Sequence, residues 1–355
     1  METISGTNCS IYFGTTGYET LSSILLPSKY SKLFILVDEN TSQHCLPHFL
    51  SNLATEIEIE IIELEVGEIH KNIATCTEVW GGLSELGADR KSILLNLGGG
   101  VISDLGGFVA CTFKRGIDFI NIPTTLLAMV DASVGGKNGI DLDNLKNQIG
   151  IIREPKAVVI DTHFLETLPQ NEMRSGLAEM LKHGLIHDVS YWNKFKNLKD
   201  LNTNHLEVLI HQSIQIKNEI VSKDLREENI RKTLNFGHTL GHAIESYFLE
   251  ENSQITLLHG EAIAVGMILE SFLSKEKGLL SNNEYQEIKY IINDVFERVS
   301  FSNEAIQKII ELLDYDKKNE FGTIQFVLLQ GIGKSIINQI IDNSLIYKAF
   351  DDYKM

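Results

Sequence analysis

Over the first 165 residues, five apolar runs rich in β-branched residues alternate with helical stretches, and this alternation strongly constrains the fold. The runs are KLFILVD at 32–38, IEIEIIELE at 57–65, SILLNLG at 92–98, DFINIP at 118–123 and KAVVID at 156–161. Such a pattern is typical of βαβ units in a parallel sheet. From Leu168 onward the spacing is helical, as at 206–221 and 259–273, with one late strand pattern at 322–329. We therefore expect an α/β domain at 1–165 and a mostly α-helical domain at 166–355.

Composition excludes several classes of protein. The 355 residues include 43% hydrophobic side chains, enough for a large core. A formal charge of −17, from 31 basic and 48 acidic side chains, argues against nucleic acid or an anionic membrane as partner. The four cysteines form no CxxC pair, the first residues lack the blocks of a secretion signal, and no apolar run approaches the roughly 20 residues that span a bilayer. We expect a cytoplasmic protein.

The segment LNLGGGVISDLGG at 95–107 reads as a strand, a glycine turn and a helix, a setting that suits a phosphate-bearing cofactor. We expect Asp104 in the first turn of that helix. Thr124 and Thr125 follow the next strand and belong to the same carboxyl edge of the sheet, where open α/β folds bind ligands. Asp38 ends the first strand and is either a ribose ligand or a helix cap. The simpler alternative for the turn is a tight connection without a ligand.

Residues 129–150 are dense in functional side chains. Asp131, Lys137, Lys146 and Asn147 stand among glycines, which allow the backbone to approach a ligand closely. The alternative is a solvated surface loop with scattered charges.

Three stretches of the second half offer metal donors: GLAEMLKHG at 176–184, NFGHTLGHAIE at 235–245 and LHGEAIAVGM at 258–267. Glu179 shares a helix face with Lys182 and His183. His238 and His242 are four residues apart and could chelate one ion, or they are ordinary core or surface histidines. His259 lies at an expected helix N-terminus, just before Glu261, where a neutral imidazole is favoured. Two histidines and one carboxylate leave coordination positions open, as in catalytic zinc sites, but spacing does not say which two histidines.

Together these motifs resemble the 3-dehydroquinate synthase family of sugar phosphate cyclases. The resemblance extends from about Asp38 to Lys318 and also includes GEIHK at 67–71, FKRG at 113–116 and RKTLNFGHTLGHAIE at 231–245, in the family's order. It implies a Rossmann-like N-terminal domain that binds NAD, a helical C-terminal domain that binds Zn²⁺ or Co²⁺, an active site between them, and a homodimer. The implied reaction converts 3-deoxy-D-arabino-heptulosonate 7-phosphate to 3-dehydroquinate and phosphate. It proceeds through transient oxidation by NAD, phosphate elimination, reduction, ring opening and aldol closure.

The resemblance also implies a role for individual residues. The metal ligands are Glu179, His238 and His259. The catalytic residues are Lys137, Lys182, His242 and Asp131, and the substrate contacts are Arg115 (on the neighbouring subunit's phosphate), Asn147, Lys217, Arg231, Asn235 and Lys318, with Lys317 as a second candidate for the last position. The NAD contacts are Asp38, Glu68, Lys71, Gly99, Gly100, Val101, Asp104, Thr124, Thr125, Lys146 and Thr167.

The chain departs from the family pattern in an insertion near 246–257 and in the tail after Lys334, to which we assign no role.

Two rival functions remain. Other sugar phosphate cyclases share the fold and cofactors, but a substrate without a carboxylate leaves Arg231 unpaired. A metal-dependent polyol dehydrogenase of the glycerol dehydrogenase type shares the architecture and consumes NAD. A binding protein without catalysis is a third class.

Overall fold

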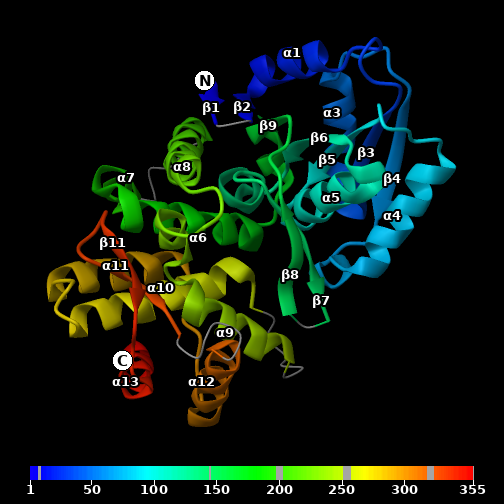
Figure 1. Ribbon diagram of the computed structural model, residues 1–355. Coiled ribbons are helices and arrows are strands. Elements are labelled where there is room, and N and C mark those ends of the chain that lie inside the picture. Colours follow the sequence, from blue (N-terminus) through cyan, green and yellow to red (C-terminus); the bar gives the residue numbers. More distant parts are fainter. Residues whose placement is uncertain (7–8, 144, 197–202, 251–256, 318–323, 355) are drawn as a thin grey trace. The chain divides into compact units, whose positions relative to one another are not determined.

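The computed structural model describes residues 1–6, 9–143, 145–196, 203–250, 257–317 and 324–354 (Figure 1). The chain divides into two compact units, Met1–Pro169 and Gln170–Met355. The boundary expected between residues 165 and 166 falls within the 3-10 helix η4 (Thr162–Thr167), which ends the first unit.

The first unit contains a seven-stranded sheet with the order β1-β2-β9-β6-β5-β3-β4. The β1–β2 pair is antiparallel and the remaining pairs are parallel. The strands are β1 (Ile4–Ser5), β2 (Ser10–Phe13), β3 (Leu33–Asp38), β4 (Ile59–Leu64), β5 (Ile93–Gly98), β6 (Asp118–Pro123) and β9 (Ala157–Ile160). All five strands expected from the sequence are present, and the predicted parallel α/β domain is confirmed.

The central strands are buried on both faces, which explains their continuous apolar sequences. Every residue of β5 is buried, and in β3 only Asp38 is not. The helices of this unit are α1 (Gly14–Ile24), α2 (Glu39–His44), α3 (Leu46–Asn52), α4 (Ile73–Glu85) and α5 (Gly100–Thr112). Side chains of α4 and α5 pack with those of β3, β5 and β6 into one hydrophobic cluster. This packing holds the carboxyl end of β5 and the start of α5 in place.

Residues 129–150 do not form the surface loop that was the simpler alternative. Ala128–Ala132 form a π-helix, and β7 (Lys137–Leu142) pairs antiparallel with β8 (Leu145–Ile152). The buried Asn138 side chain donates to the carbonyl oxygens of Gly136 (2.9 Å) and Arg153 (2.8 Å), which ties together the base of this hairpin. The glycines in the segment obscured its strand pattern.

The second unit is mostly helical, as predicted. Its helices are α6 (Gln170–His187), α7 (Val189–Asn193), α8 (Thr203–Lys223), α9 (His238–Glu250), α10 (His259–Glu276), α11 (Asn282–Val295), α12 (Asn303–Lys317) and α13 (Asn343–Lys354). Strands β10 (Phe326–Leu329) and β11 (Ser335–Gln339) form an antiparallel pair. The expected helices at 206–221 and 259–273 lie within α8 and α10, and the expected late strand contains β10. Helix α10 is almost entirely buried and forms the centre of this unit.

The tail after Lys334 belongs to this core. Ile346, Phe350 and Tyr353 of α13 are buried, and Lys289 of α11 donates to the backbone and side chain of Asp352 at 2.7 and 2.9 Å. The tail therefore has the structural role that the sequence did not reveal. In the part of the chain that the structure describes, no helix combines the length and hydropathy needed to cross a membrane.

Candidate metal centre and cofactor site

Glu179 lies in the middle of α6 and is fully buried. Its Oε2 forms an ion pair with Lys182, one turn further along the same helix. Its Oε1 has no hydrogen-bond donor among the described residues, yet it lies 3.5 Å from Nε2 of His238 and 3.9 Å from Nε2 of His259. Lys182 offsets the charge at Oε2, but Oε1 is buried and faces two imidazole nitrogens, a set of donor atoms that suits a metal cation. These three side chains therefore fit a divalent metal ion.

His238 begins α9 and is oriented by the backbone. Its Nδ1 lies 3.2 Å from the carbonyl oxygen of Phe236. Because a carbonyl only accepts, Nδ1 carries the proton and Nε2 presents its lone pair. Burial, followed by the positive charge of Lys182, holds the pKa of His238 well below its ordinary value. The ring is thus neutral at neutral pH, which is the form that binds a metal.

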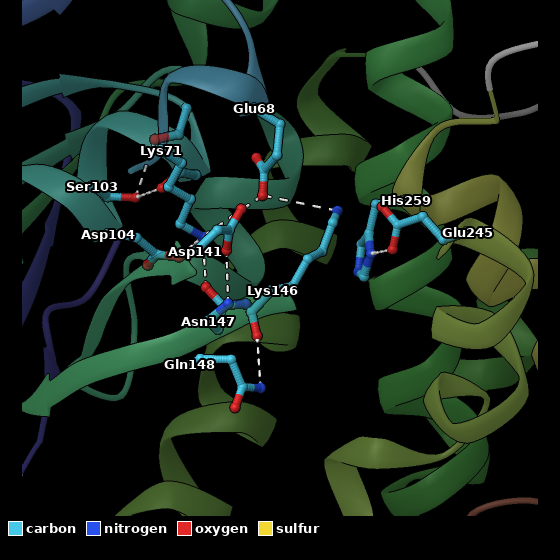
Figure 2. A network of polar contacts seen from close by, with 12 residues as sticks. Glu68, Lys71, Ser103, Asp104, Asp141, Lys146, Asn147, Gln148, Glu245 and His259 are labelled. Atoms are coloured by element: carbon cyan, nitrogen blue, oxygen red, sulfur yellow. Dashed lines mark hydrogen bonds and ion pairs between the residues drawn. The ribbon is translucent and has the colours of Figure 1, made fainter. Parts of the chain in front are cut away.

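His259 begins α10 and is oriented by a carboxylate. The Glu245 carboxylate accepts from Nδ1 of His259 at 3.2 Å, a contact shown in Figure 2. The start of α10 is also tied to α6, because Gly260 donates its backbone N–H to Ser175 Oγ at 3.0 Å. The expected helix start at His259 is confirmed, and Glu261 accepts from the Leu258 N–H as part of a capping box.

His242 lies close to both other imidazoles. One ligand atom from each of His238, His242 and His259 falls within 4.8 Å of the other two, and the rings of His238 and His242 have centroids 5.1 Å apart. His242 is exposed, whereas His238 and His259 are half-buried. The structure thus gathers all four donors found in the sequence.

Three other predicted substrate contacts belong to the second unit. Lys217 of α8 and Arg231 of the 3-10 helix η6 (Ile230–Asn235) are both buried. Arg231 donates from Nη1 to the carbonyl oxygen of Leu225 at 2.7 Å, and Asn235 donates from Nδ2 to Glu227 at 2.7 Å. Buried basic groups on an acidic protein provide the local positive charge that an anionic substrate requires.

The glycine turn in the first unit forms the expected connection between strand and helix. Helix α5 begins at Gly100, and its N-cap Gly99 provides no side-chain cap. A Cβ atom on Gly99 would lie 3.1 Å from Cγ2 of Thr125. The amides at this helix N-terminus carry no side-chain cap, and such amides fit a phosphate group.

Asp104 is not in the first turn of α5, contrary to expectation, because the helix already begins at Gly100 and Asp104 is its fifth residue. Its carboxylate instead accepts from Lys71 Nζ at 2.7 Å (Figure 2). Lys71 is buried and also donates to Oδ1 of Asn147 at 2.7 Å, and Glu68 lies 3.9 Å away. Burial lowers the pKa of Lys71, but the charges of Asp104 and Glu68 outweigh it and hold that pKa above its ordinary value. Burial raises the pKa of Asp104, an effect that Lys71 only partly offsets.

Figure 2 shows how the hairpin residues join this network. Lys146 Nζ lies 3.8 Å from Glu68, and the backbone N–H of Asn147 donates to Asp141 at 2.6 Å. Asn147 has a φ of 53°, a left-handed conformation that asparagine tolerates better than most residues. Lys71 thus links a predicted NAD contact, Asp104, to a predicted substrate contact, Asn147. Lys137 begins β7 with an exposed side chain, and Asp131 lies in the π-helix.

Several of the other predicted contacts lie at the ends of strands and helices. Asp38 caps α2 through its Oδ1, which accepts from the N–H of Thr41 at 2.8 Å, while its proposed contact with NAD stays a prediction. Thr124 follows β6 directly, Val101 lies in the first turn of α5, and Thr167 ends η4. Arg115 is exposed at the end of the 3-10 helix η2 (Phe113–Arg115), whereas Lys318 and residues 251–256 of the insertion lie outside the described part.

Three acidic residues at or near the site were missed at the sequence level. Asp141 and Glu245 fall inside motifs that were recognised, and Glu245 follows His238 by seven residues, which places both on one face of α9. Glu270 is a lone acid within the apolar run of α10 and contacts the start of α9. The helical spacing from His238 could have identified Glu245. Its position as an acid within an apolar helix could have identified Glu270.

Comparison with known proteins gives a consistent result. Residues 61–175 match the family model of the 3-dehydroquinate synthase N-terminal domain, and residues 176–319 match that of the C-terminal domain. The chain is 41% identical over 337 residues to the 3-dehydroquinate synthase of Parabacteroides distasonis, which covers 94% of both chains. It is 40% identical over 324 residues to that of Helicobacter pylori strain 26695, which covers 91% of this chain and 92% of the relative.

Solved structures agree on the fold. A 2-deoxy-scyllo-inosose synthase complexed with carbaglucose-6-phosphate, NAD⁺ and Co²⁺ superposes with a TM-score of 0.85 at 25% identity, covering 99% of each chain. The 2-epi-5-epi-valiolone synthase of Streptomyces hygroscopicus, with NAD⁺ and Zn²⁺ bound, has a TM-score of 0.82 at 24% identity, covering 100% of this chain and 99% of the other. A probable glycerol dehydrogenase from Sinorhizobium meliloti shares the fold at 14% identity, with a TM-score of 0.61 and coverage of 99% and 98%. The sequence matches are to 3-dehydroquinate synthases, and the chain belongs to the 3-dehydroquinate synthase family.

Proposed function

We propose that this protein converts 3-deoxy-D-arabino-heptulosonate 7-phosphate to 3-dehydroquinate and phosphate, as a phosphate-eliminating lyase with NAD and a divalent metal as cofactors. The observation that carries the proposal is the pairing of a buried carboxylate–imidazole cluster with buried basic side chains in one unit. Glu179, His238 and His259 suit a metal, and Lys217 and Arg231 suit an anion. The heptulosonate offers hydroxyls to the first group and a carboxylate to the second.

The cofactors have defined roles in this proposal. The metal, held by Glu179, His238 and His259, supplies Lewis acidity toward substrate hydroxyls, and NAD supplies a reversible hydride acceptor. Open coordination positions are expected with three protein ligands, as in other catalytic zinc sites. The uncapped start of α5 at Gly100 supports binding of the dinucleotide phosphates.

The first unit provides the proposed NAD contacts. They are Asp38, Glu68, Lys71, Gly99, Gly100, Val101, Asp104, Thr124, Thr125, Lys146 and Thr167. The Lys71 network supports this assignment, because a buried ammonium held charged by Asp104 and Glu68 gives the site a fixed polar geometry before the cofactor arrives.

The remaining residues of the chain bind the substrate and move its protons. Arg231 and Lys217 hold the carboxylate, with Asn235 beside Arg231 in the same 3-10 helix. His242, Lys137 and Asn147 hold the phosphate. His242 transfers a proton to the phosphate as the phosphate leaves. Lys182 and Asp131 orient the sugar hydroxyls, and the ion pair with Glu179 holds the Lys182 side chain in place. Lys318 completes the phosphate contacts in this proposal.

We also propose a homodimer in which Arg115 reaches the neighbouring subunit's substrate phosphate. Arg115 is exposed, and both Lys114 and Arg115 have positive φ values, 48° and 72°. Such strained backbone conformations in non-glycine residues cluster at functional sites, which supports the proposal. Mixing Arg115→Ala with His242→Ala subunits should restore about a quarter of wild-type activity through heterodimers with one intact site. No recovery on mixing would contradict the shared site.

A cytoplasmic location is part of the proposal, supported by four cysteines that all carry free thiols. Fractionation of cells that produce the protein checks it, and recovery with an extracytoplasmic fraction would contradict it.

Replacement of Arg231 tests the substrate class. An arginine paired with a carboxylate contributes roughly 1.5–3 kcal/mol, so Arg231→Met should raise KM for the heptulosonate phosphate by about one to two orders of magnitude. Arg226→Met replaces an exposed arginine in the turn before η6; it is the matched control and should leave KM unchanged. If the wild type turns over sedoheptulose 7-phosphate or glucose 6-phosphate faster than the heptulosonate, a different sugar phosphate cyclase is the correct function.

A further inference from the structure

The start of α9 is capped by a carboxylate from a different helix. The backbone N–H of Gly237 donates to Oε2 of Glu270 at 2.6 Å, and that of Leu240 donates to Oε1 at 3.2 Å. The N–H of Thr239 also hydrogen-bonds to this carboxylate. Glu270 therefore satisfies three of the amides that a helix N-terminus leaves without an intrahelical acceptor.

The cap cannot come from the chain next to α9. Gly237 occupies the cap position with a φ of 79°, and a Cβ there would lie 2.6 Å from Cγ of Met267. A Cβ on Gly266 would lie 2.0 Å from the carbonyl oxygen of Gly237. The backbones of α9 and α10 thus approach too closely for a side chain at either position. Glu270, one turn beyond Gly266 on α10, supplies the missing acceptor.

Glu270 is completely buried, so its carboxyl group loses its hydration when it caps the helix, which costs free energy. Burial raises the pKa of its carboxyl to about 8, although the three amides favour the charged form. Helices α2, α4, α7 and α11 instead take their N-cap from a local Asp, Asn or Ser, as α11 does from Ser281. Glu270 differs from these caps because it is fully buried and comes from a second helix.

One peptide unit connects Glu270 to the metal centre. Gly237 contributes the N–H and Phe236 the carbonyl oxygen of the same planar peptide group. The N–H is held by Glu270, and the carbonyl oxygen accepts from Nδ1 of His238 at 3.2 Å. A carboxylate on the N–H polarises the peptide and strengthens the carbonyl as an acceptor. The Phe236 carbonyl thus sets the tautomer of His238, and Glu270 holds the peptide that carries this carbonyl.

We propose that Glu270 is a positioning residue of the metal centre, which orients His238 for metal binding through the Phe236–Gly237 peptide. The proposal rests on the proposed role of His238 as a metal ligand. Glu270 touches neither metal nor substrate and acts only through this peptide and the start of α9.

Zinc affinity of the Glu270→Gln variant tests the proposal directly. Glutamine keeps the volume but places an amide N–H₂ where the carboxylate accepts, so one backbone N–H loses its acceptor. Supporting partners of metal ligands typically change metal affinity 10–100-fold. Competition with a chromophoric chelator, above the pKa of Glu270, should therefore show zinc bound about 10–100-fold more weakly. The absorption bands of the Co²⁺-loaded protein should shift, because the geometry around the ion changes.

Three further variants separate the possible outcomes. Glu276→Gln, on the exposed end of α10, is the matched control and should bind zinc like the wild type. His238→Ala tests the underlying proposal: if it retains full zinc affinity, His238 is not a ligand and the proposed function must be revised. A different result would overturn the role of Glu270 alone. In that case His238→Ala loses zinc, but Glu270→Gln binds zinc like the wild type and has an unchanged Co²⁺ spectrum, even if Glu270→Gln is less stable. If Glu270→Gln does not fold, Glu270→Asp replaces it in the test, because aspartate keeps the charge on a shorter side chain. Zinc affinity of Glu270→Asp equal to that of the wild type would then overturn the proposal.

Discussion

The carboxylate of Glu245 lies 3.2 Å from Nδ1 of His259, and Nε2 of the same ring lies 3.9 Å from Oε1 of Glu179. The two nitrogens of one imidazole therefore face two different carboxylates. With the Glu245 carboxylate accepting from Nδ1, that nitrogen carries the proton and Nε2 is directed toward the proposed metal. His238 has the same arrangement, with a backbone carbonyl in place of the carboxylate.

Replacement of Glu245 should weaken the metal site. In Glu245→Gln the side chain can present its N–H₂ group to Nδ1 of His259, which favours the wrong tautomer. We expect zinc affinity to fall by about 10–100-fold, measured by chelator competition. Glu304→Gln, an exposed acid on α12, provides the control. Equal zinc affinity in the two variants would show that Glu245 has no influence on the site.

Single replacements should identify the metal ligands among the four donors. His238→Ala, His259→Ala and Glu179→Ala should each lose stoichiometric zinc, because two remaining protein ligands hold the ion too weakly. His242→Ala should retain it. Metal analysis of the purified variants checks this, and a zinc-free His242→Ala beside a zinc-replete His238→Ala would reverse the assignment.

Replacement of His242 should lower the turnover rate rather than the zinc content. Loss of a group that transfers a proton to the leaving phosphate slows turnover by roughly 10²–10⁴. We expect this decrease in kcat for His242→Ala, with NAD affinity close to wild type because the proposed NAD contacts belong to the first unit. A kcat within a few-fold of wild type would reduce His242 to a neighbour of the metal ligands.

Stability should depend on pH through Glu270. Its pKa is raised by burial to about 8, whereas an unfolded glutamate titrates near 4.5. Between these values the folded protein binds the proton and the unfolded chain does not, so stability falls as pH rises. The difference in unfolding free energy between wild type and Glu270→Gln should decrease by about 1.4 kcal/mol per pH unit from 5 to 8. Urea unfolding of the metal-free proteins measures it, and a difference independent of pH would contradict the raised pKa.

Sequence reasoning succeeded where local patterns determine structure. The β-branched runs gave the strands of the sheet, helical spacing gave α8 and α10, and the histidine motifs gave the donors that the structure brings together. The prediction for Asp104 was wrong because the glycines at 98–100 look like a turn, whereas the last of them, Gly100, is already the first residue of α5. The hairpin at 137–152 was hidden because its glycines interrupt the alternation of side chains.

The contacts that orient the site could not be predicted in the same way. Glu270 reaches Gly237 across 33 residues of sequence, and this contact depends on how closely α9 approaches α10. Lys71 and Asn147 are separated by 76 residues and meet only because the hairpin folds back onto α5. Such pairs follow from packing between elements, which a single sequence does not specify.

We expect NAD to be used catalytically while phosphate is eliminated from the heptulosonate phosphate. The decisive experiment incubates the metal-loaded protein with 3-deoxy-D-arabino-heptulosonate 7-phosphate and NAD, while phosphate release and NADH absorbance are followed together. Each substrate molecule consumed should release one phosphate, with no net accumulation of NADH. NADH that rises in step with substrate consumption, without release of phosphate, would contradict this expectation and identify a dehydrogenase.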